Sequence, residues 1–374
     1  MKKHSISYKL ILVLIFIGSC IDPLKVDIKE EVDILVVEGG ITTQPGPHYI
    51  ILSRSLKYDA TSGLIKSVNS ASVVIRDSDG NNYTLVERIG TLTDRFGYIH
   101  PVPTGIYNTT DNFSAVVGKS YTLLITTTDG IEYTSLPETI KQGSKILKLN
   151  ADFRKIPIAD TKNTVGPIKA YKFKTGLEIS VTTQDNPGEE DFYMWENNST
   201  YQISTFPEKY LARPCSGCPR IKPAPKDCCT TCWINELADR KIRLLKDNNV
   251  NGNIINTKVA FIEDDGLRFS ENRYLVRVEQ YSLSREAFQF FQLLKGQLSI
   301  DGDIFDPPPA TIRGNMINLS NPDENVIGYF RASDISVDSI FLTNDMLLER
   351  RPLQLLDDDC RVFRNGTTER PPYW

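Results

Sequence analysis

Five of the seven cysteines lie in one short stretch, and their type and spacing suggest chemistry more directly than any other residues of the chain. A C-x2-C pair is followed nine residues later by a C-C-x2-C group: Cys215, Cys218, Cys228, Cys229 and Cys232. Four thiolates at this spacing could bind a zinc ion, and a C-x2-C pair could be a redox-active dithiol. Thiols of exported proteins are usually oxidised, so we expect structural disulfides if the chain is exported.

The start of the chain is typical of a bacterial lipoprotein signal. Three lysines are followed by an apolar run over residues 10–17, and two small residues then precede Cys20. The apolar run is far shorter than the ~20 residues that cross a bilayer, so it predicts a secretory signal. We expect cleavage after residue 19 and acylation of Cys20, because several acyl chains together give stable anchoring.

Six cysteines then remain in the mature chain, and the sixth is Cys360. An even number in an oxidising compartment indicates disulfides. Cys360 is far from the others in sequence, so we expect it to be bridged to the loop at 215–232, and which cysteine it uses stays open. The neighbours Cys228 and Cys229 should point apart, so we expect each of them to pair elsewhere.

The charge balance excludes some classes of partner. The chain has 43 Lys and Arg against 47 Asp and Glu, and loss of Lys2, Lys3 and Lys9 with the signal leaves 40 basic residues and a net charge of −7. This balance argues against nucleic acid or anionic lipid as the main partner. The mature chain retains only His48 and His100, which gives little basis for catalysis or metal binding by histidine.

Two further patterns resemble functional sites but lack an essential part. Residues 247–252 match the first half of a calcium-binding loop, but Lys258 occupies the position of the bidentate glutamate, so we expect a hairpin turn through Asn251 and Gly252 instead. The acidic run at 189–191 could suit a glycosidase, although such runs also occur on exposed turns. The chain has no G-x-S-x-G, H-E-x-x-H or phosphate-binding glycine loop. We therefore predict no catalytic residues, no bound metal and no cofactor.

The elements that must position these residues are mostly short strands. Residues 20–31 mix charge with proline and should form a tether. Residues 32–140 then contain apolar runs separated by Gly, Asn and Asp at 34–40, 48–53, 71–76, 82–87, 120–127 and 131–134. This spacing predicts an all-β domain, an immunoglobulin-like or prealbumin-like sandwich of roughly seven strands.

Residues 141–374 should form a larger β-rich domain. We take 141–163 as the polar connection and predict strands at 177–182, 192–195, 258–262, 274–279 and 325–332. The Cys-rich and Pro-rich insert at 207–233 should be a stapled loop, and the tail at 365–374 should not form a strand.

One amphipathic helix is expected in this second domain. Ser284 can cap its start and Gly296 its end. Its apolar face should consist of residues at i, i+3, i+4 and i+7 spacing: Ala287, Phe290, Phe291 and Leu294.

Several of these stretches together resemble a known family. They are Cys20 with its signal, residues 35–39, 46–47, 252–254, 302–307, 314–318 and 326–330, and the ending from Cys360 to Trp374. The chain resembles the Bacteroidota lipoprotein family catalogued as domain of unknown function 4249. The resemblance implies an outer-membrane lipoprotein, on the cell surface or the periplasmic face, often encoded beside TonB-dependent nutrient receptors. It implies no catalytic residues.

The expected function is therefore that of a binding or accessory lipoprotein rather than an enzyme. Its partners would be the membrane, through the lipid on Cys20, and a TonB-dependent receptor; its ligand is open. An extracellular carbohydrate hydrolase and a structural or adhesive surface protein are the alternatives.

Overall fold

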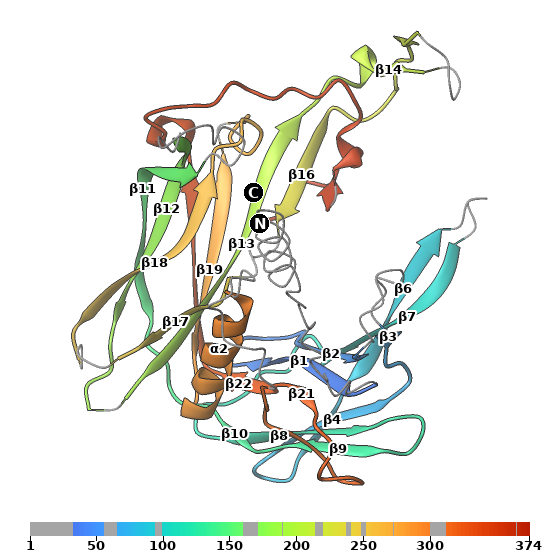
Figure 1. Cartoon of the computed structure of the whole chain (residues 1–374), viewed down its shortest axis with the longest axis vertical. Helices are drawn as coiled ribbons and strands as arrows, with labels where there is room; N and C mark the ends of the chain where they lie inside the picture. Colours follow the sequence, from blue (N-terminus) through green and yellow to red (C-terminus); the bar gives the residue numbers. More distant parts are fainter. Residues whose placement is uncertain are drawn as a thin grey trace, which may run out of the picture.

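The computed structural model describes residues 33–55, 66–93, 99–159, 171–188, 190–213, 220–236, 241–247, 252–271, 273–299, 312–363 and 365–374. These residues fold mainly into β-sheets, which confirms the all-β prediction. Among them, α2 (Arg285–Leu298) is the one α-helix, with three short 3-10 turns: η1 (Pro207–Lys209), η2 (Asn344–Met346) and η3 (Cys360–Val362). Figure 1 shows a sandwich at the bottom, a second group of long strands above it, and α2 where the two meet.

Two sheets form the sandwich. The first contains β1 (Leu35–Thr42), β2 (Tyr49–Arg54), β3 (Lys66–Ser67), β6 (Val86–Thr93), β7 (Ile99–Asn108), β21 (Ile327–Gly328) and β22 (Arg331–Ser333). The second contains β4 (Ser72–Asp77), β5 (Asn82–Thr84), β8 (Ser120–Thr126), β9 (Glu132–Ser135), β10 (Glu138–Thr139) and β20 (Met316–Asn318).

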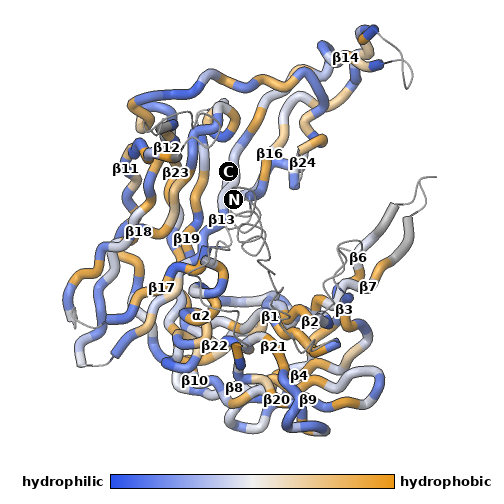
Figure 2. The backbone as a smooth tube through the Cα atoms, viewed as in Figure 1, coloured by the Kyte–Doolittle hydropathy of each residue, from blue (hydrophilic) through white to orange (hydrophobic). Residues whose placement is uncertain are grey.

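Alternating apolar residues explain this packing. Leu35 and Val37 of β1 and Ile75 of β4 are fully buried and belong to one core, as does Leu123 of β8. Because successive side chains of a strand point to opposite faces, each strand supplies every second residue to the core. Figure 2 shows the resulting mixture of hydrophobic and hydrophilic positions along the strands of both units.

Three strands of the sandwich come from far along the chain, which the expected boundary at residue 140 did not include. β20 pairs with β9, while β21 and β22 pair in parallel with β1. The sandwich therefore consists of residues 33–140 together with 316–333. Strands of two or three residues are too short to show an alternation of apolar and polar side chains. Their position therefore depends on which edge strand of the sheet pairs with them.

The second unit also consists of two main sheets. One contains β11 (Ile146–Ala159), β12 (Tyr171–Gln184) and β18 (Ile254–Glu263). The other contains β13 (Phe192–Ser204), β16 (Thr231–Glu236), β17 (Arg243–Lys246), β19 (Tyr274–Ser282), β23 (Ile335–Leu342) and β24 (Gly366–Thr367). Buried residues of both sheets, such as Ile179 and Val276, form a common core.

One predicted connection in this unit is wrong. The expected polar connection at 141–163 contains β11, a strand of 14 residues whose Leu149 and Phe153 pack on the core. Its many charged residues alternate with these apolar ones and hid the pattern. The hairpin turn expected at Asn251 and Gly252 falls partly on residues 248–251, which lie outside the described residues; the strands on either side of it, β17 and β18, pair with β13 and β12 in different sheets.

Helix α2 begins as predicted and ends later. The Ser284 hydroxyl accepts a hydrogen bond from the backbone N–H of Ala287 at 3.0 Å, which is a helix N-cap. Gly296 lies inside the helix, and Ser299 is the C-cap residue. The most buried side chains are Ala287, Phe288 and Phe290, which pack against β13.

The described part of the insert at 207–233 contains regular pieces as well as loop. It includes η1 and a small two-stranded sheet of β14 (Leu211–Ala212) and β15 (Lys222–Pro223), and β16 begins within it. The tail also contributes a two-residue strand, β24, contrary to expectation, because the edge of β16 accepts it.

Candidate functional site

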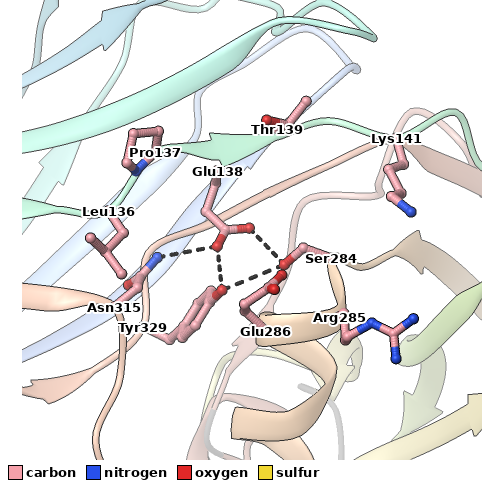
Figure 3. Close-up of a pocket in the computed structure, with 10 residues that line it drawn as sticks. All are labelled: Leu136, Pro137, Glu138, Thr139, Lys141, Ser284, Arg285, Glu286, Asn315 and Tyr329. Carbon is pink, nitrogen blue, oxygen red and sulfur yellow. Dashed lines mark hydrogen bonds between the residues drawn. The ribbon is translucent and has the colours of Figure 1, made fainter.

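A cavity of about 370 Å³ lies where the sandwich meets α2 (Figure 3). Ten residues from three separate parts of the chain line it: Leu136, Pro137, Glu138, Thr139, Lys141, Ser284, Arg285, Glu286, Asn315 and Tyr329. Its volume is within the range of small-molecule sites. None of these ten residues was predicted as a ligand-binding residue; Ser284 was predicted only as a helix cap.

The Glu138 carboxylate is the centre of this cavity, and three side chains are hydrogen-bonded to it. Ser284 Oγ donates to Oε2 at 2.9 Å, Asn315 Nδ2 lies 3.5 Å from Oε1, and the Tyr329 hydroxyl donates to Oε1. The residue is only 4% exposed. One acidic side chain therefore joins the end of the sandwich, the start of α2 and the returning segment that carries β20 and β21.

Local structure holds each partner in place. Glu138 begins β10, which pairs with β8 next to Tyr121. The Asn315 side chain forms two hydrogen bonds of 2.9 Å with the backbone of Phe330. These bonds hold the two ends of the segment 315–330 together. The Tyr329 ring lies 5.1 Å from that of Phe290, which attaches it to the helix.

Burial changes the acid–base properties of these groups. Removal from water raises the pKa of the Glu138 carboxyl above its usual 4.5, and the hydrogen bonds from Tyr329, Ser284 and Asn315 oppose the rise. Burial also raises the pKa of the Tyr329 phenol, and the nearby Glu138 adds to the effect. The carboxyl is therefore easier to protonate than one in water.

The rim of the cavity is charged. Lys141, Arg285 and Glu286 line it, and Arg285 forms an ion pair with Glu190 outside it. Glu286 adds a repulsive charge that contributes to the raised pKa of Glu138. The lining contains no histidine or cysteine, so its chemistry is that of carboxyl, hydroxyl, amide and cationic groups. Such groups can bind and orient a small polar molecule.

The four cysteines that the structure describes are not part of this lining, and all four are paired. Cys232 is bonded to Cys360, with Cα atoms 5.7 Å apart, so Cys360 is bridged to the loop as expected. Cys228 and Cys229 are bonded to each other, which corrects the expectation that they pair elsewhere. The peptide bond between them is cis. Cys20, Cys215 and Cys218 lie outside the described residues.

The described residues contain neither a cluster of metal ligands nor a membrane-spanning helix. In that part of the chain, no group of three or more His, Cys, Asp and Glu side chains could hold a metal ion. None of the described segments forms a helix with the length and apolar character needed to cross a membrane. Asp247 of the calcium-like pattern is described, but residues 248–251 are not.

One sequence signal could have identified Glu138. Glu138 and Ile140 are both buried and Thr139 between them is exposed, so the acid occupies the same inward phase as an apolar residue. A charged residue in that phase predicts a buried site with dedicated partners. Tyr329 and Asn315 could not be linked to it, because about 180 residues separate them from it in sequence.

Comparison with known proteins identifies the family. Residues 21–338 match the model of a family described as a domain of unknown function, DUF4249. No curated protein and no solved structure matches the chain. The match covers most of the chain, including the sandwich and all residues that line the Glu138 cavity, and the chain therefore belongs to the DUF4249 family.

Proposed function

We propose that this protein is a lipid-anchored binding or accessory component of the outer membrane that works with a TonB-dependent nutrient receptor. The signal at residues 1–20 supports the anchor, and the resemblance to a lipoprotein family supports the partner. The observation that carries the binding role is the buried Glu138 in its cavity. A small polar ligand bound there would contact both units at once, so the site is suited to reporting occupancy to a partner.

Binding explains this cavity better than catalysis. Glu138 already accepts hydrogen bonds from Ser284 and Tyr329, and both of these groups are fixed by their own neighbours. A general base or nucleophile must be able to reach a substrate atom, whereas a carboxylate held by three protein donors keeps about one of its four acceptor sites for a ligand, which favours a fixed recognition surface. The charged side chains of the rim would then select among ligands by their charge.

The anchor is tested by Cys20→Ala. We expect the variant to lose palmitate labelling and to leave the membrane fraction, because its thiol is the acylation site. Wild-type protein is the positive control. Palmitate incorporation that survives the substitution would rule out Cys20 as the site.

The binding role is tested on tagged, full-length protein purified from its native membrane. We expect a receptor to co-purify, and we expect saturable binding to some members of glycan and peptide panels without turnover.

Glu138→Gln should weaken that binding about tenfold, since one charge-assisted contact is removed. The exposed Glu132→Gln is the matched control and should bind like wild type. Turnover of a glycan would instead establish the hydrolase alternative.

A further inference from the structure

The insert projects from the second unit as a small tip, which we define as residues 209–213 and 220–226. The tip contains β14 and β15, whose pairing places Leu211 opposite Pro223. Figure 1 shows β14 at the opposite end of the molecule from the sandwich. No residue of the tip lines the Glu138 cavity, so a role for the tip is separate from ligand binding in that cavity.

Contacts at the base of the tip hold it on the body of the second unit. The backbone N–H of Lys226 donates to the Pro207 carbonyl at 3.0 Å, and the N–H of Phe206 donates to the Leu356 carbonyl at 2.9 Å. The Lys226 ammonium also forms an ion pair with Asp358. The second unit therefore presents the tip at a defined position.

Positive charge is concentrated in the tip. Residues 209–226 contain five basic and no acidic residues, in a mature chain whose net charge is negative. Lys226 is neutralised by Asp358, and the Lys209 ammonium lies 3.9 Å from the centre of the Phe206 ring. The other three basic residues are exposed and have no ion-pair partner among the described residues: Arg213, Arg220 and Lys222.

The neighbouring acids, Glu208 and Asp227, lie at the base of the tip. Glu208 follows Pro207, and Asp227 follows Lys226, whose backbone is hydrogen-bonded to that of Pro207. The negative charge is therefore at the base, and the unpaired positive charge is in the outer part. Charge complementarity favours an anionic partner for the outer part of the tip.

The tip also exposes aliphatic side chains. Leu211 is 55% exposed, Ile221 is 57% exposed, and Pro223 is exposed as well. Because Leu211 lies opposite Pro223 and Ile221 is two residues from Pro223, the three share one face of the small sheet. Exposed apolar side chains beside cations are typical of protein segments that lie in the interface of an anionic membrane.

A bilayer suits this surface better than a second protein does. A stable protein interface buries about 800 Å² on each partner, and it usually has aromatic anchors that fill pockets. The tip has only two strands of two residues each, and its exposed apolar side chains are aliphatic. A fluid bilayer surface requires neither a large area nor a complementary shape.

We therefore propose that the tip docks on the surface of an anionic lipid bilayer. Leu211 and Ile221 enter the boundary between the headgroups and the acyl chains. Arg213, Arg220 and Lys222 contact the lipid phosphates. This inference rests on the lipid anchor proposed above, because tethering raises the effective concentration of the bilayer at the tip. The negative charge of the rest of the chain is repelled by the same surface, so the tip sets the orientation of the protein on the membrane.

Tryptophan fluorescence tests this contact in the full-length lipoprotein, reconstituted through its anchor into vesicles of phosphatidylcholine and phosphatidylglycerol. Leu211→Trp places a reporter on the tip, and brominated phosphatidylcholine quenches tryptophans that reach the acyl chains. We expect the emission that this variant adds to that of wild type to fall by about half. Leu319→Trp is the matched control, since Leu319 is 52% exposed but belongs to the sandwich, and its added emission should not change. Equal quenching of the two reporters would overturn the proposal.

Charge reversal tests the cations. Arg220→Glu combined with Lys222→Glu should abolish the quenching of Leu211→Trp. Lys145→Glu combined with Lys148→Glu is the matched control, because these lysines are also exposed and the net charge changes by the same amount. Both proteins should keep the wild-type urea unfolding transition, since only exposed side chains are replaced. Equal losses of quenching in the two proteins would overturn the role of the tip cations.

The lipid composition provides a second test of the charges. Quenching of Leu211→Trp should weaken when phosphatidylglycerol is omitted from the vesicles or when the salt concentration is raised, because the attraction to lipid phosphates is screened. Quenching that is indifferent to both changes would contradict an anionic bilayer as the partner.

Flotation of the vesicles separates this inference from the anchor. Protein that does not float with phosphatidylcholine vesicles lacks the anchor, and that result overturns both proposals. Protein that floats, but in which the emission of Leu211→Trp is not quenched, overturns only the docking of the tip. If Arg220→Glu combined with Lys222→Glu then also loses the co-purified receptor, the tip is a surface for that protein instead.

Discussion

Glu138 shows how one residue can hold three distant segments together. Its carboxylate accepts hydrogen bonds from Ser284 at the start of α2 and from Tyr329 in the returning segment, while its own backbone belongs to β10. A carboxyl buried at this position without such donors would cost too much folding free energy. The residue is therefore both the chemical centre of the cavity and a structural joint.

Glu138→Gln should remove a pH dependence of stability. Because burial raises the pKa of the folded-state carboxyl above 4.5, the folded protein binds this proton more tightly than the unfolded chain. Its contribution to stability is complete below about pH 4.5 and is lost as the pH rises through the raised pKa. The free energy of unfolding of wild type minus that of the variant should therefore fall from about pH 4 towards neutrality.

Urea unfolding at a series of pH values measures this difference. Glu132→Gln, on the neighbouring strand β9, is the control and should follow the wild-type profile. A difference between wild type and Glu138→Gln that is constant, or that increases with pH, would contradict the assignment.

At the scale of elements, α2 depends on a residue that serves two purposes. The Ser284 hydroxyl accepts from the N–H of Ala287 and donates to Glu138. Ser284→Ala removes the helix cap and one partner of a buried carboxylate, and each loss costs about 1 kcal/mol or more. We expect the free energy of unfolding to fall by about 2 kcal/mol in urea denaturation.

The control for this prediction lies at the other end of the same helix. Ser299 is exposed, and its hydroxyl donates to the Gly296 carbonyl, so Ser299→Ala should change stability by no more than about 0.5 kcal/mol. Equal effects of the two serine substitutions would show that the hydrogen bond from Ser284 to Glu138 adds nothing to the free energy of unfolding.

The parallel pairing of β21 with β1 depends on Gly328. The residue has φ +107°, and a Cβ atom there would lie 1.8 Å from the Val37 carbonyl oxygen. Gly328→Ala should therefore lower the free energy of unfolding by about 3 kcal/mol or more, because backbone must move on both strands.

Gly296→Ala is the opposite case and serves as the control for Gly328→Ala in the same thermal or urea measurement. Gly296 lies in the interior of α2, and nothing lies within 4 Å of the position of an added Cβ. Alanine should raise stability by about 0.5–1 kcal/mol, since it is the better helix former. A tolerated Gly328→Ala would mean that β21 does not complete the sandwich.

At the scale of the whole molecule, one disulfide joins the insert to the tail. Cys232 and Cys360 are both fully buried, and 128 residues separate them. Replacing both by alanine should lower the free energy of unfolding by about 4 kcal/mol, because the unfolded chain loses a constraint on a long loop.

The bridge between Cys228 and Cys229 is the natural control in urea unfolding of oxidised protein. It links adjacent residues and closes almost no loop, so alanine at both positions should have a much smaller effect. A similar effect of the two double substitutions would mean that local packing in the insert, not the long bridge, stabilises this part of the molecule.

Local patterns in the sequence determined the class of the fold. Alternating apolar residues and turn residues were sufficient for the all-β prediction, and the strands around Val37, Ile75 and Leu123 lie where that alternation placed them. The start of α2 at Ser284 was likewise predictable, since a cap depends on residues three positions apart. The family was also recognisable from motifs spread along the chain.

Other features were decided only by the tertiary structure. The Glu138 cavity, the return of β20 to β22 to the sandwich and the choice of Cys232 by Cys360 each join residues more than 120 positions apart. No local pattern encodes such pairings. They depend on which sheet edges and buried polar groups still lack a hydrogen-bond partner once contacts between residues close in sequence have formed. The tip of the insert is intermediate: its lack of acidic residues is visible in the sequence, but the face formed by Leu211, Ile221 and Pro223 exists only once β14 has paired with β15.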